Sequence, residues 1–179
     1  MPARQPMSET RLETAFGANA ADLLRYLARR VPEAEDAADL LSETMETAWR
    51  KIGSLPAEPE RARMWLFAIA RNKLLHHGRA RRRRSNAVDA LRAALATHPP
   101  GDEHTTDVAI DVRRAVERLT PELAEIIRLI HWDGFTAADA AELLRIPAAT
   151  ARSRHARARE LLAGELADLT TAANADSPA

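Results

Sequence analysis

Apolar side chains recur every three or four residues through the first part of the chain, which is the spacing of one face of a helix. The first stripe runs from about Glu9 to Val31, and its members are Leu12, Phe16, Ala20, Leu23, Leu27 and Val31. Pro32 begins a second stretch, whose apolar stripe consists of Ala37, Leu41, Met45, Ala48 and Ile52. Acidic residues in its first turn suit the positive end of a helix dipole. The pattern therefore predicts two successive helices, the second ending near Gly53.

A third helix is predicted after a short loop. The loop, Ser54 to Pro59, contains two prolines, and helical spacing resumes from Arg61 to about Arg82. The apolar members of this stripe are Trp65, Leu66, Ile69, Ala70 and Leu74. The spacing of Trp65 favours a place in the core. Together, the three stretches predict a three-helix N-terminal domain over residues 8–84.

The middle of the chain changes character. Residues 85–106 combine small side chains with Pro99-Pro100-Gly101, a composition typical of a flexible linker, whose Ala-rich part, Val88 to Ala96, is able to form a transient helix. Helical periodicity returns in residues 107–169. Its first two stripes are Val108, Val112, Val116 and Leu119, then Leu123, Ile126, Ile127 and Ile130, followed by Asp133-Gly134. The residues from Thr170 onward are interpreted as a disordered tail.

Residues 135–166 have the outline of a helix-turn-helix. Thr136 and Asp139 have the spacing of a capping box at the start of the first helix. Arg145-Ile146-Pro147 interrupts that helix, and its proline suits the first turn of the next one. The inward stripe of the second helix is predicted to be Ala148, Ala151, Ala158 and Leu162. His155 lies on the same side, so we expect it to be a half-buried structural histidine.

The whole pattern predicts an all-α protein of two small helical domains joined by a flexible linker, with four helices in the second domain. Its composition, 46% apolar but only 4% aromatic, suits Ala- and Leu-rich helical cores. No apolar run approaches the roughly 20 residues that span a bilayer. The N-terminus lacks the apolar centre of a secretory signal, and the absence of cysteine excludes disulfides and thiolate metal sites. We therefore expect a cytoplasmic protein without membrane insertion.

Charge is segregated along the chain although the formal net charge is zero. Val31 to Trp49 contains six acidic residues and no Lys or Arg, whereas Arg61 to Arg84 contains nine basic residues and no acid. The second helix of the helix-turn-helix adds Arg152, Arg154, Arg157 and Arg159. Separate acidic and basic faces indicate at least two kinds of partner, one of them nucleic acid.

The order of these parts resembles the ECF (extracytoplasmic-function) group of sigma factors, the promoter-recognising subunits of bacterial RNA polymerase. The resemblance covers nearly the whole chain. Three segments carry it: EDAADLLSETMETAW at residues 35–49, WLFAIARNKLLHHGRARRRR at residues 65–84, and LTPELAEIIRLIHWDGFTAADAAELLRIPAATARSRHARAREL at residues 119–161.

The resemblance implies a transcription initiation factor that is not an enzyme and uses no catalytic residue, metal or cofactor. Residues 8–84 would form a sigma region 2-like domain that binds core RNA polymerase and recognises and melts the minus-ten element of promoter DNA. Residues 107–169 would form a sigma region 4-like domain that reads the minus-thirty-five element. An anti-sigma factor is a further partner that the resemblance implies.

The resemblance also assigns individual residues. Core-polymerase binding falls to Asp39, Leu40, Glu43 and Glu46. The minus-ten region would be contacted by Arg63, Arg71, Asn72, Lys73, Arg79 and Arg82, and strand opening would use the loop and first turns at Ser54 to Arg63. The minus-thirty-five region would be read by Thr150, Arg152, Ser153, Arg154, Ala156 and Arg157, among which Thr150 and Arg154 are expected to position the backbone.

The chain departs from the usual pattern of this group at a few positions. Ser42 stands where a glutamine is common, and Arg145 stands where the turn often has glycine, so the bend is made without the residue that tolerates positive φ most readily. Ala140, Ala151 and His155 replace larger apolar residues, which predicts a looser second domain.

Two other functions are weighed against this one. A stand-alone helix-turn-helix transcription regulator would explain the C-terminal half equally well, but not the acidic and basic helices of the first domain. A metal-dependent hydrolase would have to use His76, His77 and His104 with an acid such as Asp102. Adjacent helical histidines point in different directions, so this ligand geometry is poor.

Overall fold

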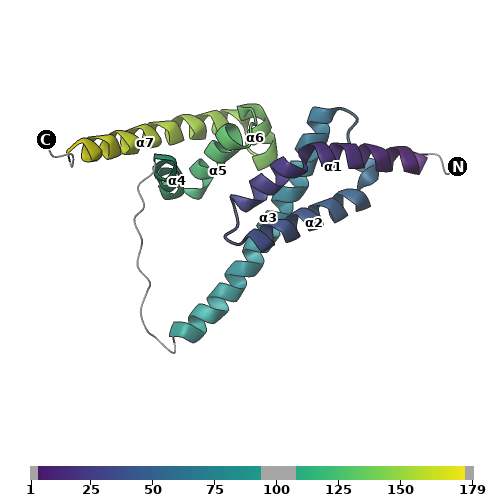
Figure 1. Cartoon of the computed structure of the whole chain (residues 1–179), viewed down its shortest axis with the longest axis horizontal. Helices are drawn as coiled ribbons and strands as arrows, with labels where there is room; N and C mark the ends of the chain where they lie inside the picture. The colour runs from purple at the N-terminus through teal and green to yellow at the C-terminus, as the bar shows by residue number, and fades with distance from the viewer. Residues whose placement is uncertain (1–3, 94–107, 176–179) are drawn as a thin grey trace. The chain divides into compact units, whose positions relative to one another are not determined.

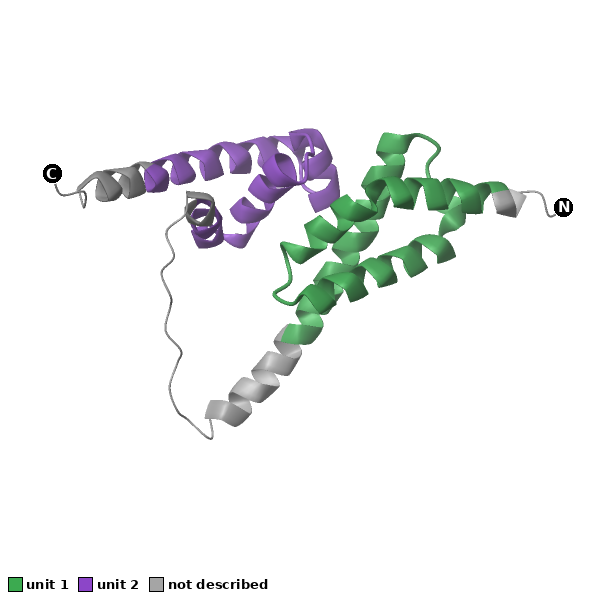
Figure 2. Cartoon of the chain, in the orientation of Figure 1, with its two compact units in different colours: residues 1–98 green, residues 99–179 purple. Residues whose placement is uncertain are grey.

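The computed structural model describes the backbone of residues 4–93 and 108–175 and the side chains of residues 7–81 and 112–166. Within the described backbone, the regular elements are all helical (Figure 1). Contacts group the chain into two compact units, residues 1–98 and residues 99–179 (Figure 2). The prediction of an all-α fold in two helical domains is confirmed.

Unit 1 contains α1 (Arg4–Ala28), α2 (Ala34–Arg50) and α3 (Pro59–Ala93), with a short 3-10 turn η1 (Ile52–Ser54) before α3. Each of the three α-helices packs against the other two. The largest fully buried side chains of this unit are Leu12, Leu23, Tyr26, Leu27, Thr44, Leu66 and Phe67. The core of unit 1 is therefore shared by all three helices.

An aromatic pair joins α1 to α3 inside this core. The rings of Tyr26 and Phe67 meet edge to face with centroids 5.3 Å apart, a geometry that aromatic quadrupoles favour. Both residues are almost completely buried. Neither was singled out by the apolar periodicity, because that spacing identified other members of the same helix faces.

The buried side of α2 differs from the predicted stripe. Ala37, Leu40, Thr44 and Ala48 are buried, whereas Leu41 and Met45 are only half-buried. The buried Thr44 hydroxyl donates a hydrogen bond of 2.7 Å to the carbonyl oxygen of Leu40, so its burial leaves no unpaired donor. The core stripe of α2 is thus rotated toward Leu40 relative to the expectation.

Two helices extend beyond the predicted ends. The backbone of α3 continues to Ala93, past Arg84 and into the first residues of the predicted linker. Residues 85–93, SNAVDALRA, contain neither proline nor glycine to stop a helix. The remaining residues of the predicted linker, 94–106, lie outside the described range. At the other end of the chain, α7 continues to Ala175, which corrects the expectation of a disordered tail from Thr170.

Unit 2 contains α4 (Val108–Arg118), α5 (Pro121–Ile127), a π-helical segment η2 (Arg128–Trp132), α6 (Ala137–Leu144) and α7 (Ala148–Ala175). Because η2 continues α5 directly, the unit has the four helical runs that the sequence predicts. Helix α7 packs against α4, α5 and α6. The unit's buried positions include many alanines, namely Ala115, Ala124, Ala140, Ala141, Ala151 and Ala158.

The start of the helix-turn-helix is held by the predicted capping box. The Thr136 hydroxyl accepts a hydrogen bond from the Asp139 amide at 3.1 Å, and the Asp139 carboxylate accepts one from the Thr136 amide at 3.1 Å. Two of the backbone amides that the start of a helix leaves without a helical partner are thereby paired. Just before it, Gly134 adopts a φ of 74°, a conformation that glycine takes without strain.

The turn between α6 and α7 is a Schellman motif in which the left-handed residue is an arginine. Arg145 has φ 55° and ψ 46°. Its amide donates to the carbonyl of Glu142 at 3.1 Å, and the Ile146 amide donates to the carbonyl of Ala141 at 3.0 Å. The bend therefore has the usual hydrogen bonds of a glycine-ended helix, with the added strain of a side chain at positive φ.

Replacing the strained residue tests this reading of the turn. We expect Arg145→Gly to raise the free energy of unfolding of unit 2 by about 0.5 to 1 kcal/mol, because glycine adopts the left-handed conformation without a Cβ clash. Hydrogen exchange of unit 2 amides in the full chain measures this change. Gly134→Ala, which introduces a Cβ at the other positive-φ position, should lower the same free energy, and an Arg145→Gly variant less stable than the wild type would contradict the prediction.

Candidate nucleic-acid and partner interfaces

The acidic side of α2 is available to a partner at three of its four predicted positions. Asp39, Glu43 and Glu46 are exposed. Leu40 is only 2% exposed, so its assignment to the polymerase-binding surface is corrected: its side chain packs in the core of unit 1. Leu40 follows Asp39 around the helix by about 100°, which turns its side chain from the acidic side toward the interior.

An apolar groove lies beside these carboxylates, and sequence reasoning missed it. Phe16, Leu41, Met45 and Trp49 line the groove together with the polar residues Ser42, Glu46 and Arg50, and its volume is about 550 Å³. The Trp49 side chain is 43% exposed, which is unusual for the largest apolar residue type. The feature of the sequence that could have indicated this groove is a tryptophan at the end of an acidic helix. Acidic and apolar surfaces therefore adjoin on the same helix.

Some acidic side chains of α2 lie against basic side chains of α3 within unit 1. Lys73 Nζ lies 3.0 Å from a carboxylate oxygen of Glu43, and His77 Nε2 lies 3.5 Å from a carboxylate oxygen of Asp36. Lys73 thus faces α2 in this structure, away from the outward side of α3. The two segments of opposite charge that the sequence separates are in contact along this seam.

Arg63 is held inside unit 1. Its guanidinium donates to Asp22 at 2.6 Å and to the side-chain oxygen of Asn19 at 2.9 Å, and it lies 4.6 Å from the centre of the Phe67 ring. The hydrogen bond from Arg63 is the main cause that lowers the pKa of Asp22, and Arg25 lowers that pKa further. The geometry therefore makes Arg63 a link between α3 and α1.

The outward side of α3 carries the remaining residues predicted for the minus-ten region. Asn72 and Arg79 are exposed and Arg71 is half-buried, while Trp65, which its spacing placed in the core, is only half-buried. The side chain of Arg82 lies outside the described residues. A basic helix side with an amide that both donates and accepts hydrogen bonds suits contact with a nucleic-acid strand.

The second helix of the helix-turn-helix, α7, separates its residues cleanly by face. Ala151 and Ala158 are completely buried, but the other two residues of the predicted inward stripe are not: Ala148 is exposed and Leu162 is half-buried. Four predicted base-contacting residues are exposed, namely Arg152, Ser153, Ala156 and Arg157. Thr150 and Arg154, which were expected to position the backbone, are half-buried. One face of α7 thus presents two arginines with a serine and a small apolar residue between them.

A histidine pair joins η2 to α7. The Nε2 atoms of His131 and His155 lie 2.9 Å apart, and the ring centroids lie 5.1 Å apart. At this distance one ring donates and the other must accept, so at least one imidazole is neutral. Burial lowers the pKa of His155, and the charges of His131 and Arg159 lower it further. The half-buried structural role predicted for His155 agrees with this position.

Comparison with known proteins gives the family. The family model "Sigma-70 region 2" matches residues 15–84, and "Sigma-70, region 4" matches residues 109–162. The Mycobacterium tuberculosis protein "ECF RNA polymerase sigma factor SigC" is 35% identical over 84% of this chain and 80% of its own length. "ECF RNA polymerase sigma factor SigM" of the same species is 33% identical over 78% of this chain and 69% of its own length. The chain belongs to the ECF sigma factors.

A solved ECF-type structure supports this assignment. The sigma factor RpoE of Bartonella quintana, determined in complex with the anti-sigma factor NepR, aligns with a TM-score of 0.64 at 26% identity. The alignment covers 88% of this chain and 95% of RpoE. Sigma factors are transcription initiation factors and have no enzymatic activity, so the hydrolase alternative loses its support.

The residues proposed for a hydrolase do not form a site in the described structure. Among the described side chains, no three His, Cys, Asp or Glu residues are placed to hold a metal ion. His104 and Asp102 lie outside the described residues. His77 instead pairs with Asp36. None of the described helices of this sigma factor is long and apolar enough to cross a membrane.

The histidine pair predicts how unit 2 responds to acid. Because the pKa of folded His155 is lowered, the unfolded chain binds a proton there more readily. The neutral His155 side chain therefore contributes to the stability of unit 2 in full above the unfolded histidine pKa of about 6.5. That contribution is lost as the pH falls below this value. We expect acidification from about pH 7 to about pH 5 to destabilise unit 2 more in the wild type than in His155→Gln.

Hydrogen exchange of unit 2 amides, corrected for the intrinsic exchange rate at each pH, measures the difference. His76→Gln is the matched control, because His76 is exposed and lies in unit 1. The same pH dependence in the wild type and in His155→Gln would show that protonation of His155 does not affect the stability of unit 2.

Proposed function

We propose that this ECF sigma factor binds core RNA polymerase through unit 1 and directs initiation at promoters whose two elements are read by the two units. The observation that carries the proposal is the outward face of α7, where arginines project opposite fully buried alanines within a region 4 match. Residues 8–84 would supply polymerase binding and minus-ten recognition, and residues 107–169 minus-thirty-five recognition. Residues 85–106, of which 85–93 continue α3, would connect them. Such a protein acts in the cytoplasm, where bacterial promoters are transcribed.

Polymerase docking is assigned to the acidic and apolar sides of α2. Asp39, Glu43 and Glu46 supply the charge, and the groove that includes Trp49 supplies apolar area. Interfaces combine aromatic anchors, which contribute most of the affinity, with charges that steer association. The adjoining surfaces of α2 offer both, so we expect a partner surface that is basic and partly apolar.

Minus-ten contact is assigned to the outward side of α3 and to the loop before it. Arg71, Asn72 and Arg79 are the residues whose positions suit the displaced strand or its phosphates, and Arg82 continues the same basic segment. Lys73 joins them only if its pair with Glu43 opens. Phosphate contacts of this kind release counterions, so binding weakens steeply as salt rises. Strand opening is assigned to the loop and first turns at Ser54 to Arg63, within which Arg63 itself has a structural role.

Minus-thirty-five recognition is assigned to α7 in the major groove. Arg152 and Arg157 are long enough to pair with guanine, Ser153 is able to donate or accept, and Ala156 suits contact with a thymine methyl group. Thr150 and Arg154 lie at the border of the buried face, a position that suits phosphate contacts. An anti-sigma factor is a proposed further partner, by likeness to the RpoE structure solved with NepR.

Reconstituted transcription tests the proposed function. Core polymerase with this chain should initiate at specific promoters, and mapping the transcripts identifies both elements. Arg157→Ala should then reduce initiation about tenfold at promoters with the matching upstream element, since one good arginine contact discriminates by about 1 to 3 kcal/mol. Other upstream sequences should be affected less.

Glu160→Ala is the matched control for this variant. Glu160 forms an exposed ion pair with Arg157 at 3.2 Å, and such pairs contribute at most about 1 kcal/mol. If Arg157→Ala reduced initiation equally at all upstream sequences, this face of α7 would contact only phosphates and would not read bases. No binding to core polymerase and no specific initiation by the wild type would favour a stand-alone helix-turn-helix regulator.

Charge reversal tests the docking surface separately. Asp39→Lys should weaken binding to core polymerase about tenfold, because it places like charges against a basic partner. Asp39 is the preferred site, since Glu43 already pairs with Lys73 in unit 1. Glu13→Lys makes the same change of charge on the exposed side of α1 and should leave the affinity nearly unchanged. Equal affinities for both variants in a quantitative pull-down would remove the acidic side of α2 from the interface.

A further inference from the structure

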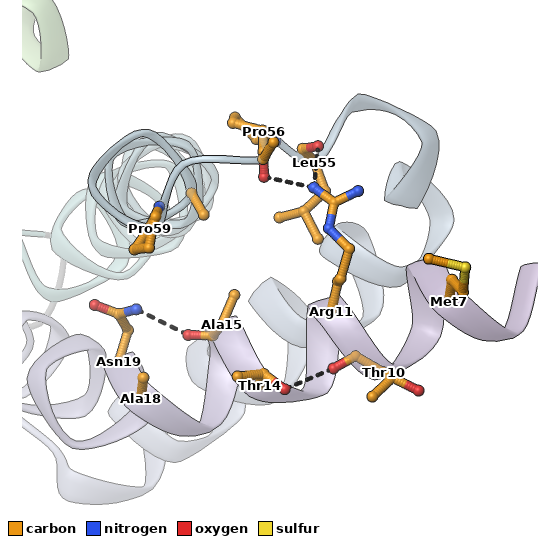
Figure 3. A pocket seen from close by; sticks show the side chains of 12 residues that line it. Met7, Thr10, Arg11, Thr14, Ala15, Ala18, Asn19, Leu55, Pro56 and Pro59 are labelled. Atoms are coloured by element: carbon orange, nitrogen blue, oxygen red, sulfur yellow. Dashed lines mark hydrogen bonds between the residues drawn. The ribbon is translucent and has the colours of Figure 1, made fainter. Parts of the chain in front are cut away.

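Arg11 connects α1 to the loop that precedes α3. Its Nη2 atom donates to the carbonyl oxygen of Pro56 at 2.9 Å and reaches the carbonyl oxygen of Leu55 at 3.4 Å (Figure 3). The residues are more than forty positions apart in the chain, so these contacts fix tertiary structure rather than a local turn. One guanidinium therefore binds two successive backbone carbonyls of the same loop.

The loop has few internal means of holding its shape. It runs from the end of η1 to Pro59, and its prolines have no amide hydrogen to donate. Leu55 is buried and fastens the loop on its apolar side, with its amide donating to Ile52 at 3.1 Å. On the polar side, Arg11 supplies a charged donor, and hydrogen bonds with a charged partner are the stronger kind.

A pocket of about 580 Å³ lies between α1 and this loop. Arg11, Thr14 and Asn19 line it from α1, while Leu55 and Pro59 line it from the loop and the start of α3 (Figure 3). Arg11 spans the two walls through its hydrogen bond to the carbonyl oxygen of Pro56. Loss of the Arg11 side chain would remove this polar contact between the loop and α1, while the apolar contact through Leu55 and every residue of the loop stay in place.

We propose that Arg11 is a positioning residue for promoter opening, which acts by holding the loop of residues 54–59 against α1. This inference rests on the proposed function, which assigns strand opening to the same loop and the first turns of α3. A loop held in place before DNA arrives needs no ordering when a strand is captured, and such preorganisation favours the open complex. Polymerase docking and minus-thirty-five recognition use other surfaces and do not depend on Arg11.

The test compares Arg11→Ala with Arg25→Ala in holoenzyme reconstituted from core polymerase and the full chain. Both variants remove one positive charge from α1, but Arg25 is exposed and pairs with Asp22 of the same helix, whereas Arg11 binds the loop. Permanganate reactivity of unpaired thymines measures opening on a duplex promoter and on the same promoter with a pre-melted minus-ten bubble. Core affinity is measured alongside.

We expect Arg11→Ala to lower the amount of open complex on duplex DNA about tenfold, since a hydrogen bond to a charged group is lost. The loss should shrink on the pre-melted promoter, while core affinity stays at the wild-type level and Arg25→Ala opens normally. Opening by Arg11→Ala equal to the wild type would overturn the proposal.

A loss that persists undiminished on the pre-melted promoter, or that is accompanied by weaker core binding, would also overturn it, because Arg11 would then be needed only for folding or docking. An equal loss of open complex in Arg25→Ala would also contradict the proposal, because the effect would then come from the net positive charge of α1 and not from the contact between Arg11 and the loop. Failure of the wild type to open any promoter would refute the proposed function itself, which is a distinguishable result.

Discussion

Burial of one narrow stripe on each helix is the constraint on which the partner surfaces depend. In α7, the complete burial of Ala151 and Ala158 turns Arg152 and Arg157 outward. In α2, the burial of Leu40 does the same for its neighbours on the acidic side. A helix has a fixed angular step of about 100° per residue, so settling the buried stripe settles the exposed face as well. Few residues in the core thus place most of the charges that partners would meet.

Charge pairs inside unit 1 divide its ionic residues into two kinds. Arg63 is enclosed by Asp22, Asn19 and the Phe67 ring, and several contacts act on one guanidinium. The pair of Lys73 and Glu43 is more exposed on its acidic side, where 53% of the Glu43 side chain is accessible against 37% for Asp22, although Lys73 and Arg63 are about equally accessible. Exposed pairs contribute about 0 to 1 kcal/mol, which a polymerase or a phosphate is able to replace. Arg63 belongs to the scaffold, whereas Lys73 and Glu43 remain exchangeable.

Unit 2 is shaped by the ends of its helices as much as by its core. Small alanines bring α7 close to its neighbours, but each alanine buries little apolar area and so contributes little stabilisation. Much of the local definition comes from backbone features: the capping box at Thr136, the Schellman turn at Arg145 and the π-helical segment η2. The histidine pair then ties η2 to α7. These features help to orient the recognition helix in a core where the buried alanines lie among larger residues such as Ile126, Leu129 and Phe135.

The sequence alone determined the helical class, the two-domain order, the capping box and the outward arginines of α7, because these follow from periodicity and local hydrogen bonding within a few residues. It also indicated the family through motif spacing. Only the tertiary structure decided that Leu40 is buried, that Arg63 and Lys73 face α1 and α2, and that Arg11 reaches the loop at Pro56. Those facts depend on which helices pack together and at what rotation, and a periodic pattern does not specify either.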